Sequence, residues 1–201
     1  MYVSRAGLDS GGFVLEEELE AILRGAGWTV VRPESLGMRD QIAAYVAADQ
    51  IVFAEGSALH LYAMVARPEQ KVAILCRRIP VKTKFEQQLR AYGLQDVHTI
   101  DAVQAVLAPT GPAKMGRQVL VHRQEVASIL DWKALGEALE TLGFLSKQQW
   151  RVPAADKLMF AAADVALARS AAQPGTPYAV IDRAEFLQLR NDPNVRGAGV
   201  A

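Results

Sequence analysis

The segment at residues 50–65, QIVFAEGSALHLYAMV, decides the fold that the sequence predicts. Its apolar residues 51–54 form a short continuous run, which is typical of a strand covered on both faces of a parallel sheet. Glu55 follows at the carboxyl end of this strand, and Gly56 lets another group approach the backbone closely. Ser57 is a suitable N-cap for a helix that starts at Ala58. The segment therefore predicts a buried strand, a glycine turn and a helix.

The turn at Glu55, Gly56 and Ser57 is a candidate anion site. Ligands of open α/β sheets bind at the carboxyl ends of the strands, where a helix N-terminus also offers backbone N–H groups to an anion. Phosphate is therefore the expected ligand. The alternative is an ordinary strand-to-helix connection in which Gly56 and Ser57 only form the turn.

The same alternation of strand and helix continues on both sides of this segment. Strands are expected at residues 2–4, 28–31, 71–76 and 97–100, and helices at 15–26, 35–48, 58–66 and 82–92. Such a pattern predicts an α/β fold: a Rossmann-like, doubly wound, mostly parallel sheet with helices on both faces. We assign this core to residues 1–108.

Helical periodicity also predicts which side chains of the first two helices face the core. In the helix at 15–26 the inward residues are expected to be Leu15, Leu19, Ile22 and Leu23, and the outward ones Glu16, Glu17, Glu18 and Glu20. In the helix at 35–48 the inward residues are expected to be Met38, Ile42, Tyr45 and Val46.

The carboxyl-terminal part, residues 109–201, has a weaker pattern. A turn-rich stretch at 108–112 precedes one additional strand at 118–122. Helices are expected over 125–145, with a break near Asp131, over 153–171 and over 183–189, followed by a loose tail from Asn191. We expect a mainly helical region that packs on the core.

The composition excludes several classes of function. Lys and Arg total 22 and so do Asp and Glu, so no broad basic face favours nucleic acid as a partner. Cys76 is the single cysteine, which excludes an internal disulfide and suits a reducing, cytoplasmic compartment. No segment has the length of a membrane span, and no two of the three histidines have metal-ligand spacing. We expect no metal and no cofactor, and the absence of a Gly-x-Gly-x-x-Gly fingerprint argues against a nicotinamide enzyme.

Three motifs occur together: VSR at residues 3–5, LEEEL at 15–19 and FAEGSALH at 53–60. This combination resembles glycosyltransferase family 61, the capsular-polysaccharide-type transferases. The resemblance implies a metal-independent enzyme of the GT-B type, built from two Rossmann domains, that transfers sugar from a nucleotide sugar to a saccharide acceptor, as in polysaccharide biosynthesis. It also implies that this chain is the nucleotide-sugar-binding half, beside a missing amino-terminal half. A homo-oligomer is the other arrangement that we expect.

The resemblance implies roles for Arg5, Gly56, Ser57 and His60, and a place at the strand ends adds Glu55 and Arg77. The alternative for Arg77 is a side chain that is only solvated. Arg5 and Arg77 would bind substrate from strand ends, Gly56 and Ser57 would cradle the diphosphate, and Glu55 and His60 would be catalytic. Glu55 stands where many relatives have histidine, so it is either a general base or hydroxyl acceptor, or a carboxylate satisfied by neighbouring N–H groups. Because a carboxylate is repelled by a diphosphate, we expect Glu55 to turn toward sugar hydroxyls or to pair with a cation such as Arg5 or His60. The alternative function is a non-catalytic Rossmann-like module for nucleotide binding or assembly.

Overall fold

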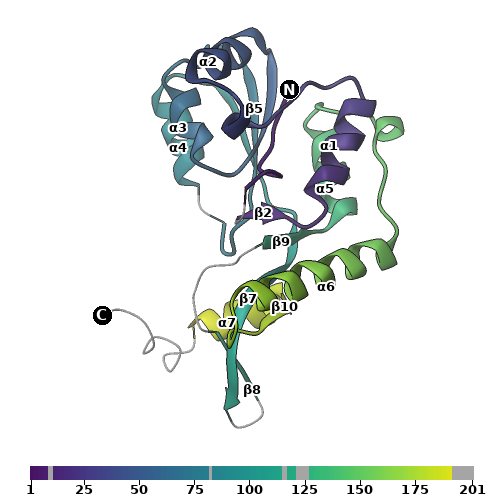
Figure 1. The fold of residues 1–201 in the computed structure, drawn as a ribbon. Helices are drawn as coiled ribbons and strands as arrows, with labels where there is room; N and C mark the ends of the chain where they lie inside the picture. The colour runs from purple at the N-terminus through teal and green to yellow at the C-terminus, as the bar shows by residue number, and fades with distance from the viewer. Residues whose placement is uncertain (9–10, 82, 115–116, 121–126, 192–201) are drawn as a thin grey trace.

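The computed structural model describes residues 1–8, 11–81, 83–114, 117–120 and 127–191, and its centre is a five-stranded, all-parallel sheet (Figure 1). The strand order is β3-β1-β4-β5-β6. The strands are β1 (Tyr2–Val3), β3 (Val30–Val31), β4 (Gln50–Ala54), β5 (Lys71–Leu75) and β6 (Asp96–Ile100). The chain leaves β1 for β3 on one side and then crosses to β4 on the other, so the predicted doubly wound α/β fold is confirmed.

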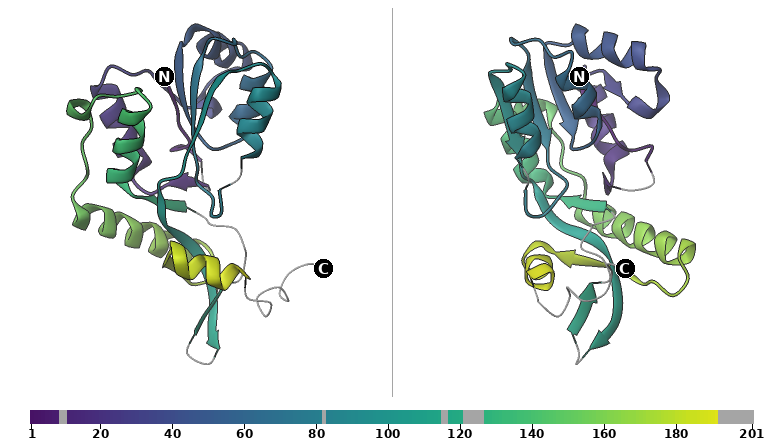
Figure 2. Two further views of the ribbon diagram at one scale, coloured as in Figure 1. Left: turned by 180° about the vertical axis from the view of Figure 1, so that it is seen from behind. Right: turned by 90° about the vertical axis from the view of Figure 1, so that its left-hand side faces the viewer.

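Helices cover both faces of this sheet (Figures 1 and 2). On one face lie α1 (Glu16–Gly25) and α5 (Trp132–Thr141), and on the other lie α2 (Met38–Ala47), α3 (Ala58–Ala63) and α4 (Lys84–Ala91). Successive side chains of β4 point to the two faces of the sheet in turn, because side chains alternate along a strand. Val52 and Ala54 belong to the core under α1 and α5, whereas Ile51 and Phe53 belong to the core under α2, α3 and α4. The sheet is thus buried on both sides.

A second, mixed sheet lies beside the first, with the order β10-β7-β9-β2. Its strands are β2 (Gly12–Phe13), β7 (Val103–Lys114), β9 (Ala127–Leu130) and β10 (Tyr178–Asp182), and β8 (Arg117–Leu120) pairs with the far end of β7. The sequence predicts only β8 among these strands. Within the described residues, β9 pairs with β7 no further than Leu107, so Pro109 lies where β7 has one neighbour, β10. A proline is tolerated where a strand has one neighbour, so this turn-like sequence is compatible with a strand.

The expected helix at 125–145 is in fact β9 followed by α5. The break near Asp131 is correct, since the Asp131 side chain caps α5 by accepting a hydrogen bond from the Ala134 N–H at 3.0 Å. Asp131 N also donates to Ala102 O at 2.7 Å, so the two ends of the excursion through β7, β8 and β9 meet. The domain boundary expected at 108 falls within β7, and it stays a prediction.

The last helices are α6 (Ala155–Ala172) and α7 (Arg183–Asn191), close to the predicted bounds. Two short 3-10 helices complete the described elements, at Pro33–Ser35 and Lys147–Gln149. The tail expected beyond Asn191 lies outside the described residues. None of the helices in the described ranges is long and apolar enough to cross a membrane.

Two predicted helix faces are wrong in part. In α2, Tyr45 is the buried residue, whereas Met38 is 68% and Val46 40% exposed. Met38 starts the helix two turns before Tyr45, and Val46 is rotated about 100° away from it, so neither reaches the sheet. In α1, Glu16 and Glu20 are buried beside Leu19 and Leu23 rather than outward.

Candidate functional site

A pocket of about 310 Å³ opens where the strand order of the parallel sheet reverses, at the carboxyl ends of β1 and β4. We call it the switch-point pocket. Its polar lining consists of Ser4, Arg5, Glu34, Gln41 and Ser57, and Gly56 also lines it. Such a reversal is where doubly wound sheets bind their ligands. The structure therefore brings Arg5, Gly56 and Ser57 together at the expected edge.

The Arg5 side chain lies against the backbone of Gly56. A Cβ atom added at position 56 would overlap Arg5 Nη1 and lie 3.3 Å from its Cδ, so glycine permits this close approach. On its other side, Arg5 Nε donates a hydrogen bond to Gly11 O at 2.8 Å. Arg5, held in this way, lines the pocket, where its guanidinium can meet an anion.

Ser57 has the predicted place before α3 but not the predicted capping contact. Its backbone is in the right-handed helical region, and its side chain makes no capping hydrogen bond within the described residues. The α3 helix is only six residues long. Ser57 therefore lines the pocket without capping the helix through its side chain.

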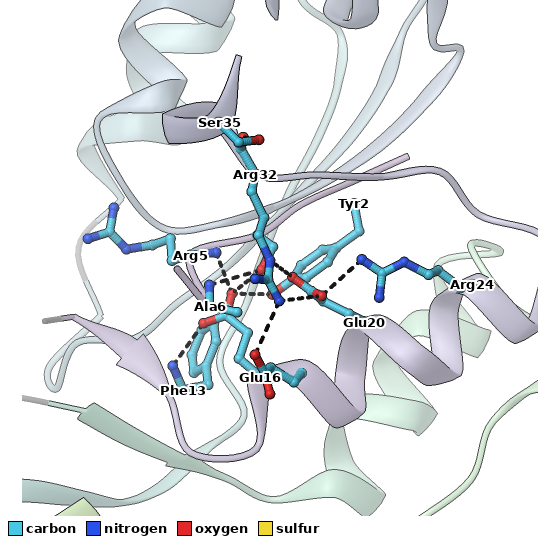
Figure 3. A network of polar contacts seen from close by, with 11 residues as sticks. Tyr2, Arg5, Ala6, Phe13, Glu16, Glu20, Arg24, Arg32 and Ser35 are labelled. Carbon is cyan, nitrogen blue, oxygen red and sulfur yellow. Dashed lines mark hydrogen bonds and ion pairs between the residues drawn. The ribbon is translucent and has the colours of Figure 1, made fainter. Parts of the chain in front are cut away.

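The buried carboxylate of Glu16 fixes the backbone that carries Arg5 (Figure 3). Glu16 Oε1 accepts hydrogen bonds from Tyr2 Oη at 2.9 Å, Ser4 Oγ at 3.1 Å and Arg5 N at 2.6 Å. Glu16 Oε2 accepts another from Phe13 N at 3.0 Å. Burial, and next the adjacent Glu16, raise the pKa of Tyr2 well above its usual value. Glu16 thus ties the end of β1 to β2.

One turn further along α1, Glu20 binds two arginines (Figure 3). Arg32 donates to it through Nε at 2.7 Å and Nη2 at 2.8 Å, and Arg24 through Nη2 at 3.0 Å. Burial alone would raise the pKa of Glu20, but the hydrogen bonds, first that of Arg32, outweigh it and lower the pKa. The signal for both glutamates is their spacing, because positions 16 and 20 share a helix face with Leu19 and Leu23.

Glu55 is buried at 1% exposure and turns away from the switch-point pocket. Its Oε2 accepts from Arg77 N at 3.1 Å, and its Oε1 lies 3.7 Å from Arg78 Nη1, with which it forms an ion pair. Within the described residues, Oε1 has no hydrogen bond. Glu55 therefore pairs with a cation, which is one of the alternatives that we expected. The cation is Arg78 of the loop after β5, rather than Arg5 or His60.

Arg77 and His60 lie outside the lining of the switch-point pocket. Arg77 Nε donates to Glu55 O at 3.0 Å, and its guanidinium packs against Gly11. His60 Nδ1 lies 3.0 Å from Gln88 Oε1 of α4, and its ring centroid is 5.2 Å from that of Phe85. The structure therefore directs His60 toward α4, and the catalytic roles of Glu55 and His60 stay predictions.

Three polar lining residues were not among the predicted site residues: Ser4, Glu34 and Gln41. Glu34 is the most informative, because it follows β3, the strand that neighbours β1. An acidic residue after this strand binds the ribose hydroxyls in many doubly wound nucleotide sites. Its place three residues beyond a predicted strand was the available signal. No group of three or more metal-ligating side chains occurs among the described residues.

Fold and pocket define a doubly wound α/β protein with a pocket at the reversal of its strand order. More particularly, residues 1–74 match the family model of Glycosyltransferase 61, which confirms the resemblance over this segment. The matching family is one of glycosyltransferases. All lining residues of the switch-point pocket, from Val3 to Ala58, lie within the matched segment. No curated protein and no solved structure shows a significant match to the chain.

Proposed function

We propose that this protein binds a nucleotide sugar in the switch-point pocket and transfers the sugar to a saccharide acceptor. The observation that supports this most is a coincidence of place: the segment that matches a glycosyltransferase family also supplies the whole lining of the pocket at the reversal of the strand order. The matched segment therefore contains every lining residue of the switch-point pocket as well as strands of the parallel sheet.

In this proposal each part of the donor has a matching group in the pocket. The diphosphate binds the Arg5 guanidinium and the backbone at Gly56 and Ser57, while Glu34 accepts hydrogen bonds from the ribose hydroxyls. The charge that develops on the departing diphosphate is stabilised by Arg5, without a metal ion, as in transferases of the GT-B type. Synthesis of a polysaccharide is the process that we propose for this reaction.

Calorimetric titration with UDP, GDP, CDP and dTDP, each beside its nucleoside, tests donor binding. We expect at least one diphosphate to bind, and Arg5→Ala to weaken it roughly tenfold or more while the nucleoside changes less than about twofold, because only the diphosphate forms a charge-assisted contact. Arg151→Ala is the matched control, since Arg151 is exposed and lines neither pocket described here. A folded protein that binds none of the four diphosphates would refute the proposal.

The proposed catalytic role of Glu55 needs a separate measurement, because Glu55 lies behind the pocket. If it is the acid or base, Glu55→Gln lowers transfer by roughly a hundredfold and keeps diphosphate affinity within a few-fold. Unchanged turnover would remove Glu55 from the mechanism. The same comparison of turnover with affinity, made for His60→Asn, tests His60.

A nucleotide-binding module without turnover is the second candidate. One observation favours it: among the residues that the structure describes, neither Glu55 nor His60 lines the switch-point pocket. Release of free sugar from a nucleotide sugar by the isolated chain would exclude this candidate, because a purely binding protein leaves the donor intact.

A further inference from the structure

A second and larger hollow adjoins the switch-point pocket. It has a volume of about 550 Å³ and lies between the first turn of α1, β2 and the helix α6, and we call it the α6 pocket. Arg5 and Leu8 line both pockets. The two hollows therefore share a wall, and the side chain that we assign to the diphosphate is part of it.

We infer that the α6 pocket binds the saccharide acceptor, and that this acceptor is neutral. The inference rests on the proposed function and names the second substrate of the same site. For transfer, an acceptor hydroxyl must reach the carbon that carries the diphosphate, so the acceptor must bind in a hollow contiguous with that of the donor. Within the described residues, the α6 pocket borders the donor hollow at Arg5 and Leu8, which line both.

The walls of the α6 pocket suit a sugar ring. Phe13, Val14 and Leu15 line it from one side, and Ala161 and Val165 line it from α6. Apolar walls of this kind cover the C–H faces of a pyranose, while a few placed polar groups fix its orientation. The volume lies within the range of about 300 to 1,000 Å³ that is usual for small-molecule sites.

Two polar side chains of α6, the exposed Asp164 and the half-buried Arg169, can offer hydrogen bonds to a ligand in the pocket. Asp164 and Arg169 both line the pocket, and within the described residues neither has a hydrogen bond or an ion pair. A carboxylate only accepts and a guanidinium only donates, so the lining offers both an acceptor and a donor to the hydroxyl groups of a saccharide. Lys157, by contrast, is engaged by Glu18 at 2.6 Å, and this ion pair joins α6 to α1.

The charges around the α6 pocket favour a neutral ligand over an acidic one. Three cationic side chains line it against four carboxylates. These residues are Arg5, Lys157 and Arg169 against Glu16, Glu17, Glu18 and Asp164. Since the lining has no excess of positive charge, a uronic or sialic acid gains no net attraction, whereas a neutral saccharide loses nothing.

The test is saturation-transfer NMR on the full chain, with lactose, cellobiose and N,N′-diacetylchitobiose as neutral probes and 3′-sialyllactose as the acidic one. We expect binding of at least one neutral probe, and Asp164→Asn to weaken it about tenfold, the loss expected for one hydrogen bond to a charged group. Ala161→Trp fills the pocket and should abolish the signal. Asp156→Asn is the matched control, because it changes an aspartate of the same helix outside the pocket.

Nucleoside diphosphate titration of the same variants separates this inference from the proposed function. Retained diphosphate affinity with loss of saccharide binding supports the assignment. Binding of sialyllactose alone, of no neutral probe, or with no effect of Asp164→Asn and Ala161→Trp overturns it, even if the diphosphate binds as expected. Failure of every diphosphate to bind the unmodified protein refutes the proposed function instead.

Discussion

Two buried carboxylates lie near the carboxyl edge of the parallel sheet, Glu16 on the β1 side and Glu55 on the β4 side, and they differ in how completely they are hydrogen-bonded. On the β1 side, Glu16 accepts hydrogen bonds from four donors. On the β4 side, Glu55 is equally buried, yet one of its oxygens has only the Arg78 ion pair at 3.7 Å within the described residues. A saturated carboxylate holds structure, whereas an incompletely satisfied one retains capacity for another partner. The β1 side is thus the scaffold, and the β4 side is where change is tolerated.

The largest effect is expected from Glu16→Ala. The substitution leaves four donors around a buried space, which should lower the free energy of unfolding by about 3 to 5 kcal/mol. Urea unfolding followed by circular dichroism measures it. Glu17→Ala is the control from the same helical turn, because the Glu17 side chain is 78% exposed. If Glu16→Ala lowers the free energy of unfolding no more than Glu17→Ala does, the β1 side is not a scaffold and does not differ from the β4 side in this respect.

The second largest effect on stability is expected from Glu20→Gln, and it should depend on pH. Because its folded-state pKa is below the ordinary value of 4.5, its contribution to stability is present above that value and is lost as the pH falls through the folded-state pKa. We expect Glu20→Gln to lower stability by about 1 to 2 kcal/mol at pH 7, and the difference from the unmodified protein to shrink below about pH 4. Unfolding curves at pH 7 and pH 3 would show this, and a difference independent of pH would contradict it.

Glu55→Gln should change stability by less than about 1 kcal/mol, because the amide oxygen can still accept from Arg77 N and the lost charge has little hydrogen bonding. The measurement is the same urea titration. A loss above about 2 kcal/mol would place Glu55 with Glu16 as a scaffold residue.

The smallest effect on stability is expected from Gly56→Ala. The new methyl group displaces the end of the flexible Arg5 side chain, so the free energy of unfolding should change by about 0.5 kcal/mol or less. Diphosphate affinity should still fall about fivefold, since Arg5 no longer lies on the backbone. In an Arg5→Ala background the second effect should vanish. If Gly56→Ala weakens binding equally with and without Arg5, the contact between the two residues is irrelevant to the site.

The parallel sheet was predictable from the sequence because its strands and helices are local patterns. Apolar runs such as residues 51–54 and amphipathic helices such as α4 carry their structure within a few residues. The second sheet was not predictable for two reasons. β2 pairs with β9, more than a hundred residues further along the chain, and the sequence around Pro109 is typical of a turn although it forms a strand. Long-range pairing of this kind leaves little local trace.

The site divides in the same way. Arg5, Gly56 and Ser57 follow strands directly, so topology alone brings them together. The partners of Glu16, Glu20 and His60 are set by tertiary packing, and the run of glutamates at 16–18 resembles a solvated helix start. The direction of the Glu55 side chain depends on the Arg77 and Arg78 loop, which no pattern around residue 55 reveals.

The hydrogen bond from Asp131 N to Ala102 O has a consequence for how the chain can vary in length. This hydrogen bond joins the two ends of the segment at residues 103–130, which contains β7, β8 and β9. Seen from the parallel sheet and α5, this segment is one closed loop. The entropy of closing a flexible loop grows only with the logarithm of its length, and each doubling costs about 0.6 kcal/mol. Residues beyond Thr110, at the β7 and β8 end, are therefore the place where insertion or shortening disturbs the switch-point pocket least.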